Sequence, residues 1–294
     1  MWPRINDVSL SALDIAIEIQ KILVTHALKQ QSPELIAQER KLTRAVRSLF
    51  DDVMDKTIDE LEGLGHIPAS MIDQQMLVRH ILDAKEDLAD VITDGTQDAA
   101  RVGRYAAALM IPGGVHFDDF SKQTHRALRD SAFEASDRII SRMTGDVMGR
   151  LAEGYAKGLG IRDVASSLTD QFSQIRGYET RRIARTEINS AQSAGRHLTM
   201  QEEGIEYHQW WTAEDDRVRE EGDADHVAMH GQIVRMGDPF SNGLRYPGDK
   251  SGDISEWINC RCIDVPFLMP LDMMPPLGMS YFYEHDIIDQ PLMG

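Results

Sequence analysis

Two histidines and the only two cysteines are the strongest candidates for chemistry in this sequence of 294 residues. His226 and His230 stand four positions apart, so a helix would place both imidazoles on one face. Cys260 and Cys262 are separated by one residue. Because thiolate sulfur and imidazole nitrogen are preferred donors to tetrahedral zinc, the four residues predict a closed, structural His2Cys2 site. The alternative is that buried cysteines and polar histidines make separate hydrogen bonds.

Catalytic interpretations of the same residues lack part of their signature. A metalloprotease helix needs Glu directly after its first histidine, and Val227 occupies that position. No local spacing pairs Cys260 or Cys262 with a histidine as a nucleophile would require. Phosphate-binding glycine loops and the G-x-S-x-G pattern of serine hydrolases are absent from the sequence. The sequence therefore favours a protein with no catalytic residues.

A group of arginines marks the start of a helical pattern from Gly177 to Gly204. The group consists of Arg176, Arg181, Arg182 and Arg185. Such residues can contact phosphate or an acidic partner, or they can pair with the chain's own carboxylates. Arg185 and Glu187 are two positions apart, so they point to different sides of the helix and are expected to contact different neighbours.

Long amphipathic helices are expected to fill the first part of the chain and to position these residues. The helical patterns cover about 7–31, 33–62, 69–92, 96–110 and 117–147. Ser32 and Pro33 mark one helix start, and Asp94-Gly95 marks an end. Glycines between 145 and 160 predict a hinge between two helical layers.

The character of the chain changes after Gly204. Residues 205–212 and 263–267 favour short strands, with turns between them. From Pro266 the chain is rich in Met and Pro and lacks Lys and Arg, so it is expected to have little helical or strand register of its own. It could wrap a neighbouring subunit, or it could be disordered. The expected fold is mainly α, with a long-helix N-terminal half and a small α+β C-terminal module.

Composition limits the classes of partner. With 31 basic and 48 acidic residues the net charge is −17, which argues against wrapping nucleic acid with the whole surface but leaves room for a local basic face. No apolar run approaches the ~18 residues of a membrane span, and the N-terminus has no secretory pattern. Two cysteines one residue apart cannot form a disulfide framework. We therefore expect a soluble protein made in a reducing cytoplasm.

Several motifs follow one another in the second half of the chain: Ala184–Glu187, Trp211–Ala213, Asp215–Arg219, His226 before Gly231, Pro239-Phe240, Pro247 and Asn259–Cys262. This ordered set resembles the C-terminal domain of the phage Mu F-like minor head proteins. The motif residues that the resemblance marks are Arg185, Glu187, Trp211, Asp215, Arg217, Arg219, Asn259 and Arg261. The resemblance covers residues 145–267, which separates a helical region (1–144) from a Met/Pro-rich tail (268–294). Residues 220–225 lengthen the segment between Arg219 and His226 relative to the family, so the resemblance alone does not indicate that these two residues act together.

The resemblance implies a minor capsid protein of a tailed bacteriophage that serves head morphogenesis from the capsid interior, near the portal. The partners it implies are the portal protein, the major capsid protein or sibling subunits. It implies no contact with a membrane. Packaged DNA is a further partner, with Arg176, Arg181 and Arg182 as its contacts. The implied role is binding in support of head assembly and genome delivery, with no cofactor or with structural zinc.

The competing hypothesis is an enzyme carried in the virion, either metal-dependent or similar to ADP-ribosyltransferases, to which phage Mu F-like modules have been linked. An active transferase of this kind is expected to carry a Glu-x-Glu pair on a strand. The C-terminal module has no such pair, and Glu60-Leu61-Glu62 lies in a helical pattern. The resemblance therefore favours a binding protein without catalysis.

Overall fold

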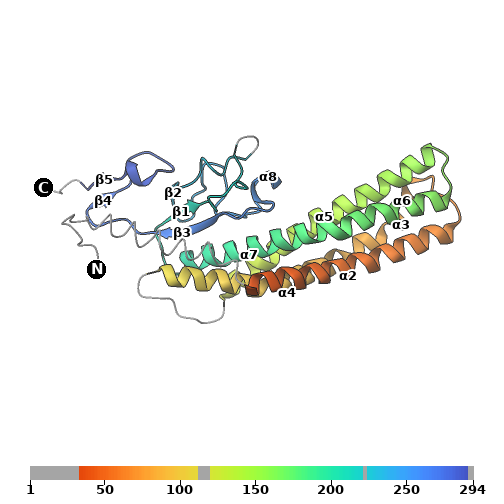
Figure 1. The fold of residues 1–294 in the computed structure, drawn as a ribbon, viewed down its shortest axis with the longest axis horizontal. Coiled ribbons are helices and arrows are strands. Elements are labelled where there is room, and N and C mark those ends of the chain that lie inside the picture. The colour runs from red at the N-terminus through yellow and green to blue at the C-terminus, as the bar shows by residue number, and fades with distance from the viewer. Residues whose placement is uncertain (1–32, 112–119, 221–223, 291–294) are drawn as a thin grey trace, which may run out of the picture. The chain divides into compact units, whose positions relative to one another are not determined.

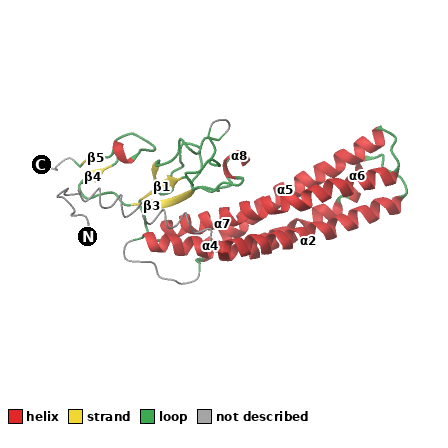
Figure 2. Ribbon diagram, viewed as in Figure 1, coloured by secondary structure: helices red, strands yellow, loops and turns green. Residues whose placement is uncertain are grey.

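The computed structural model describes residues 33–111, 120–220 and 224–290. Among these residues, 33–99 and 120–191 form a helical unit, and 100–111 with 192–290 form a second compact unit. The helices are long and the strands are short and antiparallel, so the expected mainly α fold with a small C-terminal α+β module is confirmed (Figure 2). The helix expected at 7–31 lies outside the described residues.

Long helices build the helical unit, and they run side by side in Figure 1. The helices are α2 (Pro33–Leu64), α3 (Met71–Leu77), α4 (Arg79–Met110), α5 (Lys122–Ala156), α6 (Ile161–Gln174) and α7 (Thr180–Glu202), with a π-helical turn at Ile175–Glu179 before α7. In α2 a stripe of apolar residues at three- and four-residue spacing is buried, including Leu42, Val46 and Phe50. Ser70 and Ser121 cap α3 and α5 by accepting a backbone N–H three residues on.

Of two predicted interruptions of the helices, one is wrong and the other is correct only in part. Helix α4 continues through Asp94-Gly95, because Gly95 serves close packing: a Cβ there would lie 2.7 Å from Leu42 Cδ1. Helix α5 continues through Gly145, Gly149 and Gly154, whereas Gly158 and Gly160 lie in the turn between α5 and α6, where a break was predicted. At Gly154 a Cβ would lie 2.4 Å from Val164 Cγ2, so this glycine admits α6 instead of bending the chain.

The second unit contains a three-stranded antiparallel sheet in the order β2-β1-β3. Its strands are β1 (Tyr207–Trp211), β2 (Ile233–Arg235) and β3 (Ile263–Phe267), and the short helix α8 (Ile254–Trp257) precedes β3. The strands predicted at 205–212 and 263–267 are therefore confirmed. The register places Gln209 between Ile233 and Val265, and it places Trp210 opposite Asp264.

Neighbouring residues of β1 belong to different buried clusters. Trp211 packs with Met110 from the end of α4, whereas Trp210 packs with Cys260 and Cys262. The ends of α4 and α7 in this unit approach closely because glycines face each other: a Cβ at Gly103 would lie 1.9 Å from the carbonyl oxygen of Gln192, and one at Gly195 would lie 2.1 Å from that of Ala100. Two glycines thus permit a backbone-to-backbone helix contact beside the sheet.

Part of the C-terminal segment has a defined register, contrary to prediction. Strands β4 (Met273–Met274) and β5 (Ile288–Asp289) pair antiparallel, with a 3-10 turn at Glu284–Asp286 before β5. Phe282 exchanges two backbone hydrogen bonds with Ile233, of 2.7 and 3.0 Å. The prediction failed because this order comes from pairing between residues far apart in sequence, β4 with β5 and Phe282 with β2, which no local pattern signals.

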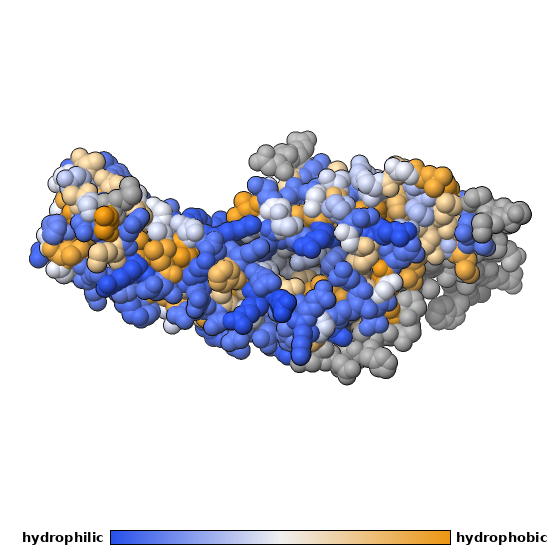
Figure 3. All heavy atoms as spheres, turned by 180° about the vertical axis from the view of Figure 1, so that it is seen from behind, coloured by the Kyte–Doolittle hydropathy of each residue, from blue (hydrophilic) through white to orange (hydrophobic). Residues whose placement is uncertain are grey.

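Hydrophilic residues cover much of the face shown in Figure 3, and apolar residues gather in small patches. In the part of the chain that the structure describes, no helix combines the length and apolar character that a membrane span requires.

Candidate metal centre

Loops of the second unit bring three of the predicted metal ligands together. His226 begins a turn that ends at Gly231, whose positive φ of 82° suits glycine and whose N–H donates to the carbonyl of Trp210 at 2.9 Å. Asn259, with φ of 52°, turns the chain after α8 so that Cys260 and Cys262 lead into β3. Both loops are thus fixed against the sheet.

The three side chains have the spacing of ligands to a single ion. His226 Nδ1 lies 3.6 Å from Cys260 Sγ and 3.5 Å from Cys262 Sγ, and all three residues are buried. Zinc bonds of about 2.3 Å to sulfur and about 2.0 Å to nitrogen, at a tetrahedral angle, separate the two donors by about 3.5 Å. The arrangement therefore fits three corners of a tetrahedral zinc site.

Glu256 orients the imidazole, a role that no sequence pattern signalled. Its Oε2 lies 3.0 Å from His226 Nε2 and accepts a second hydrogen bond from Asn242 Nδ2 at 2.8 Å. A proton on Nε2 donates to this carboxylate and leaves the Nδ1 lone pair directed at the two sulfur atoms. A carboxylate behind a ligating histidine is a recurrent feature of zinc sites.

The pKa values of His226, Cys260 and Cys262 depend on one another. A hydrogen bond from Cys262 and the contact with His226 lower the pKa of Cys260 well below its ordinary value, against the effect of burial. The interaction with Cys260 and burial raise the pKa of Cys262 well above its ordinary value. Burial lowers the pKa of His226, but Cys260 and Glu256 outweigh it and the net shift is upward. A bound cation would allow both thiols to ionise, because metal ligation requires the thiolate form.

Arg219 contacts the backbone of His226, although residues 220–225 lengthen the segment between them relative to the family. The carbonyl of Arg219 accepts the N–H groups of His226 at 3.0 Å and of Val227 at 3.1 Å. The Arg219 guanidinium donates to the carbonyl of Ile258, just before the cysteine turn. Arg219 therefore joins the two loops that carry the ligands.

A second arginine fixes the cysteine turn from the other side. Arg261 Nη1 donates to Asp215 Oδ2 at 2.6 Å, and Asp215 Oδ1 also accepts the backbone N–H of Arg217 at 3.1 Å. The hydrogen bond with Arg261 holds the pKa of Asp215 well below its usual range. The Arg217 side chain is exposed.

His230 is not part of the ligand group, and residues 226–230 form turns rather than the expected helix. Its Nδ1 lies 3.3 Å from the backbone N of Thr212 and 3.1 Å from Thr212 Oγ1. Trp211 packs against the His230 ring at a centroid distance of 4.8 Å. His230 thus joins the end of β1 to the turn, while His226 faces the cysteines.

The arginines predicted as partner contacts belong to the helical unit. Arg185 pairs with Glu39 of α2 at 3.2 Å, and Arg182 pairs with Glu179 at 3.2 Å. Arg181 is exposed, and its Nε donates to the carbonyl of Gly177 at 2.8 Å. The side chain of Arg176 lies outside the described residues. Glu187 is buried whereas Arg185 is exposed, so the two face different sides of α7 as predicted.

These features define a long-helix protein with a small antiparallel module built around a His-Cys-Cys cluster. Residues 145–264 match the family model described as Phage Mu protein F like protein. This segment is therefore similar to the phage Mu F-like proteins, a family of structural phage head proteins, and the similarity supports a protein of head morphogenesis. No curated protein and no solved structure matches the chain.

Proposed function

We propose that this chain is a minor capsid protein that binds inside a tailed-phage head near the portal and supports head assembly and genome delivery. The observation that carries the proposal is the family match over residues 145–264, which includes the whole loop system from Asp215 to Cys262. Within that system Asp215 pairs with Arg261, Phe240 packs with Trp210, and His226 faces the two cysteines. Such a module is built to hold a shape and to present it to a partner.

We also propose that His226, Cys260 and Cys262 hold a structural zinc ion. The donor separations of 3.5 and 3.6 Å and the supporting carboxylate of Glu256 favour this. When bound, zinc neutralises two thiolates. It would also tie the turn at His226 to the start of β3. The ligands are buried, which is the arrangement of a stabilising site and not of a catalytic one.

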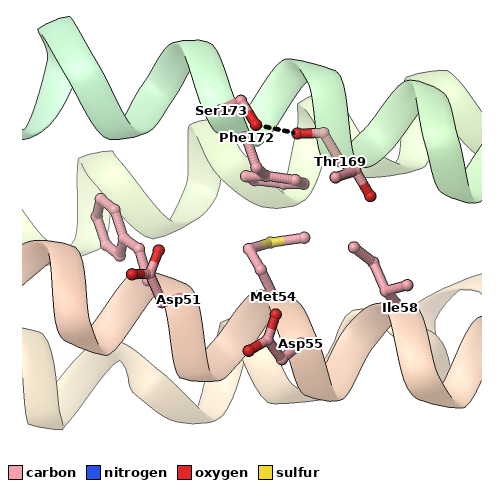
Figure 4. Close-up of a pocket in the computed structure, with 8 residues that line it drawn as sticks. Asp51, Met54, Asp55, Ile58, Thr169, Phe172 and Ser173 are labelled. Atoms are coloured by element: carbon pink, nitrogen blue, oxygen red, sulfur yellow. Dashed lines mark hydrogen bonds between the residues drawn. The ribbon is translucent and has the colours of Figure 1, made fainter.

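The helical unit supplies the protein-binding surface in this proposal. A hollow between α2 and α6 has Met54, Ile58 and Phe172 among its lining residues, and Asp51 and Asp55 lie beside them (Figure 4). An apolar surface flanked by carboxylates fits an apolar side chain next to a basic one. Portal protein, major capsid protein or a sibling subunit would provide such a segment.

Packaged DNA is the weaker partner in this proposal. Arg182 and Arg185 already pair with Glu179 and Glu39, and the net charge of −17 opposes approach to the phosphate backbone. We therefore place protein contacts first.

Mass spectrometry of purified virions, followed by imaging of the portal region, tests the location. We expect the chain in intact particles, in few copies and close to the portal. Absence from purified virions would contradict the proposal, and so would glutamate-dependent turnover of NAD by the purified chain.

A further inference from the structure

A second buried group of metal-binding side chains lies in the same unit and was not predicted from the sequence. His197 comes from α7, His208 from β1 and Asp264 from β3, and each is at most 4% exposed. Asp264 Oδ2 lies 3.0 Å from His197 Nδ1 and 3.4 Å from His208 Nδ1. All three donor atoms lie within 4.8 Å of one another. The β1–β3 register, with Trp210 opposite Asp264, brings His208 diagonally beside the carboxylate.

This group contains polar atoms without partners. Both ring nitrogens of His208 and Asp264 Oδ1 are buried and have no hydrogen-bond partner in the described part of the chain. The His208 Nδ1 atom is near the carboxylate, but the pair does not have hydrogen-bond geometry. Buried polar groups are almost always satisfied, so such a cluster calls for a bound species.

We propose that His197, His208 and Asp264 bind a divalent transition-metal ion, with zinc as the representative ion, at a site distinct from the cysteine cluster. Bonds of about 2.0 Å from nitrogen and oxygen to a tetrahedral ion separate the donors by about 3.3 Å, and the observed separations are 3.0 and 3.4 Å. The unpartnered Oδ1 of Asp264 is available as a further donor. Two imidazoles and a carboxylate suit zinc, iron, cobalt or nickel.

Arg196 is the neighbouring cation and the competing counter-ion for Asp264. It is buried on α7, and its Nε and Nη1 atoms have no hydrogen-bond partner among the described residues. Burial lowers the pKa of Arg196, although the charge of Asp264 raises it. Because Asp264 Oδ1 also has no partner, Arg196 does not satisfy that oxygen, and the position is open to an ion.

Metal content of the full-length chain tests the proposal. After loading with zinc and removal of excess, we expect two equivalents per chain by inductively coupled plasma mass spectrometry. His208→Gln is expected to lose one equivalent. A cobalt-loaded sample of this variant should keep its thiolate-to-cobalt charge-transfer band, since Cys260 and Cys262 are intact. His285→Gln, at an exposed histidine, is the matched control and should keep both equivalents.

Zinc-edge X-ray absorption of the wild-type chain tests the same proposal without any variant, because it counts the sulfur ligands per zinc ion. Two occupied sites give an average of one sulfur per zinc, whereas a lone cysteine site gives two. Saturation at one zinc with two sulfurs, or two retained equivalents in His208→Gln, would overturn the proposal. One zinc without sulfur would support this site and remove the cysteine site, so the two assignments fail separately.

Discussion

Glu256→Gln is the most informative substitution at the cysteine cluster. It keeps the shape of the side chain but removes the charge that faces His226 Nε2 at 3.0 Å. The amide must also satisfy Asn242, which now donates to the same oxygen at 2.8 Å. Both effects weaken the orientation of the imidazole, because an amide oxygen is a poorer acceptor than a carboxylate.

The expected loss of metal affinity can be estimated because Glu256 supports His226, a proposed metal ligand, through a hydrogen bond. Loss of such a supporting group reduces metal affinity by roughly 10- to 100-fold, or about 1.4 to 2.7 kcal/mol. Competition with a chromophoric chelator measures the affinity, and the thiolate-to-cobalt charge-transfer band assigns the change to the cysteine cluster. The measurement should be made at neutral pH on full-length protein.

The matched control is Glu214→Gln. Glu214 is exposed and lies 3.7 Å from His230, which is outside the ligand group. We expect its cobalt and zinc affinities to equal those of the wild type. Unchanged metal affinity in Glu256→Gln would refute the assignment of Glu256 as the group that orients His226. An equal loss of affinity in both variants would refute the exclusion of His230 from the ligand group.

Three further predictions concern the second unit and the helices. His230→Ala should leave the thiolate-to-cobalt band and the metal content unchanged, because its Nδ1 already faces other partners. Gly195→Ala should lower the free energy of unfolding measured in urea by about 1–3 kcal/mol, because the new Cβ would lie 2.1 Å from a carbonyl oxygen of α4. Gly145→Ala is the matched control: its new Cβ would have no neighbour within 4 Å, so it should raise the free energy of unfolding by about 0.5–1 kcal/mol. Asp215→Asn should lower the melting temperature at pH 7. The contact with Arg261 depresses the pKa of Asp215, so the ionised carboxylate stabilises the folded chain and this stabilisation is lost when the carboxylate is protonated. The difference in melting temperature between the variant and the wild type should therefore shrink as the pH falls below about 4. A constant difference down to pH 2 would contradict that reasoning.

Local patterns predicted the elements of this fold well. The apolar stripe of α2 and the β-favouring residues of β1 and β3 each fix a structure over a short distance in sequence. The errors occurred where a residue serves a distant neighbour. Gly95 was interpreted as a helix end, but it accommodates Leu42 within a continuous helix.

The candidate site was predictable only in part for the same reason. Cys260 and Cys262 stand close in sequence, and His226 was found because cysteine and histidine are typical zinc ligands. Glu256 and the contact of Arg219 with His226 depend on how the loops close over the sheet. Spacing along the chain does not encode that closure, so neither could be anticipated.

The pairing of Phe282 with Ile233 has a consequence for how copies of this chain coexist. In the order β2-β1-β3, the strand β2 is at the margin of the sheet, where unpaired amides and carbonyls offer a template to any extended segment. Phe282 occupies part of that margin with the chain's own backbone. A chain truncated before Phe282 would lose this protection, and its copies would be prone to edge-to-edge association wherever they are concentrated together.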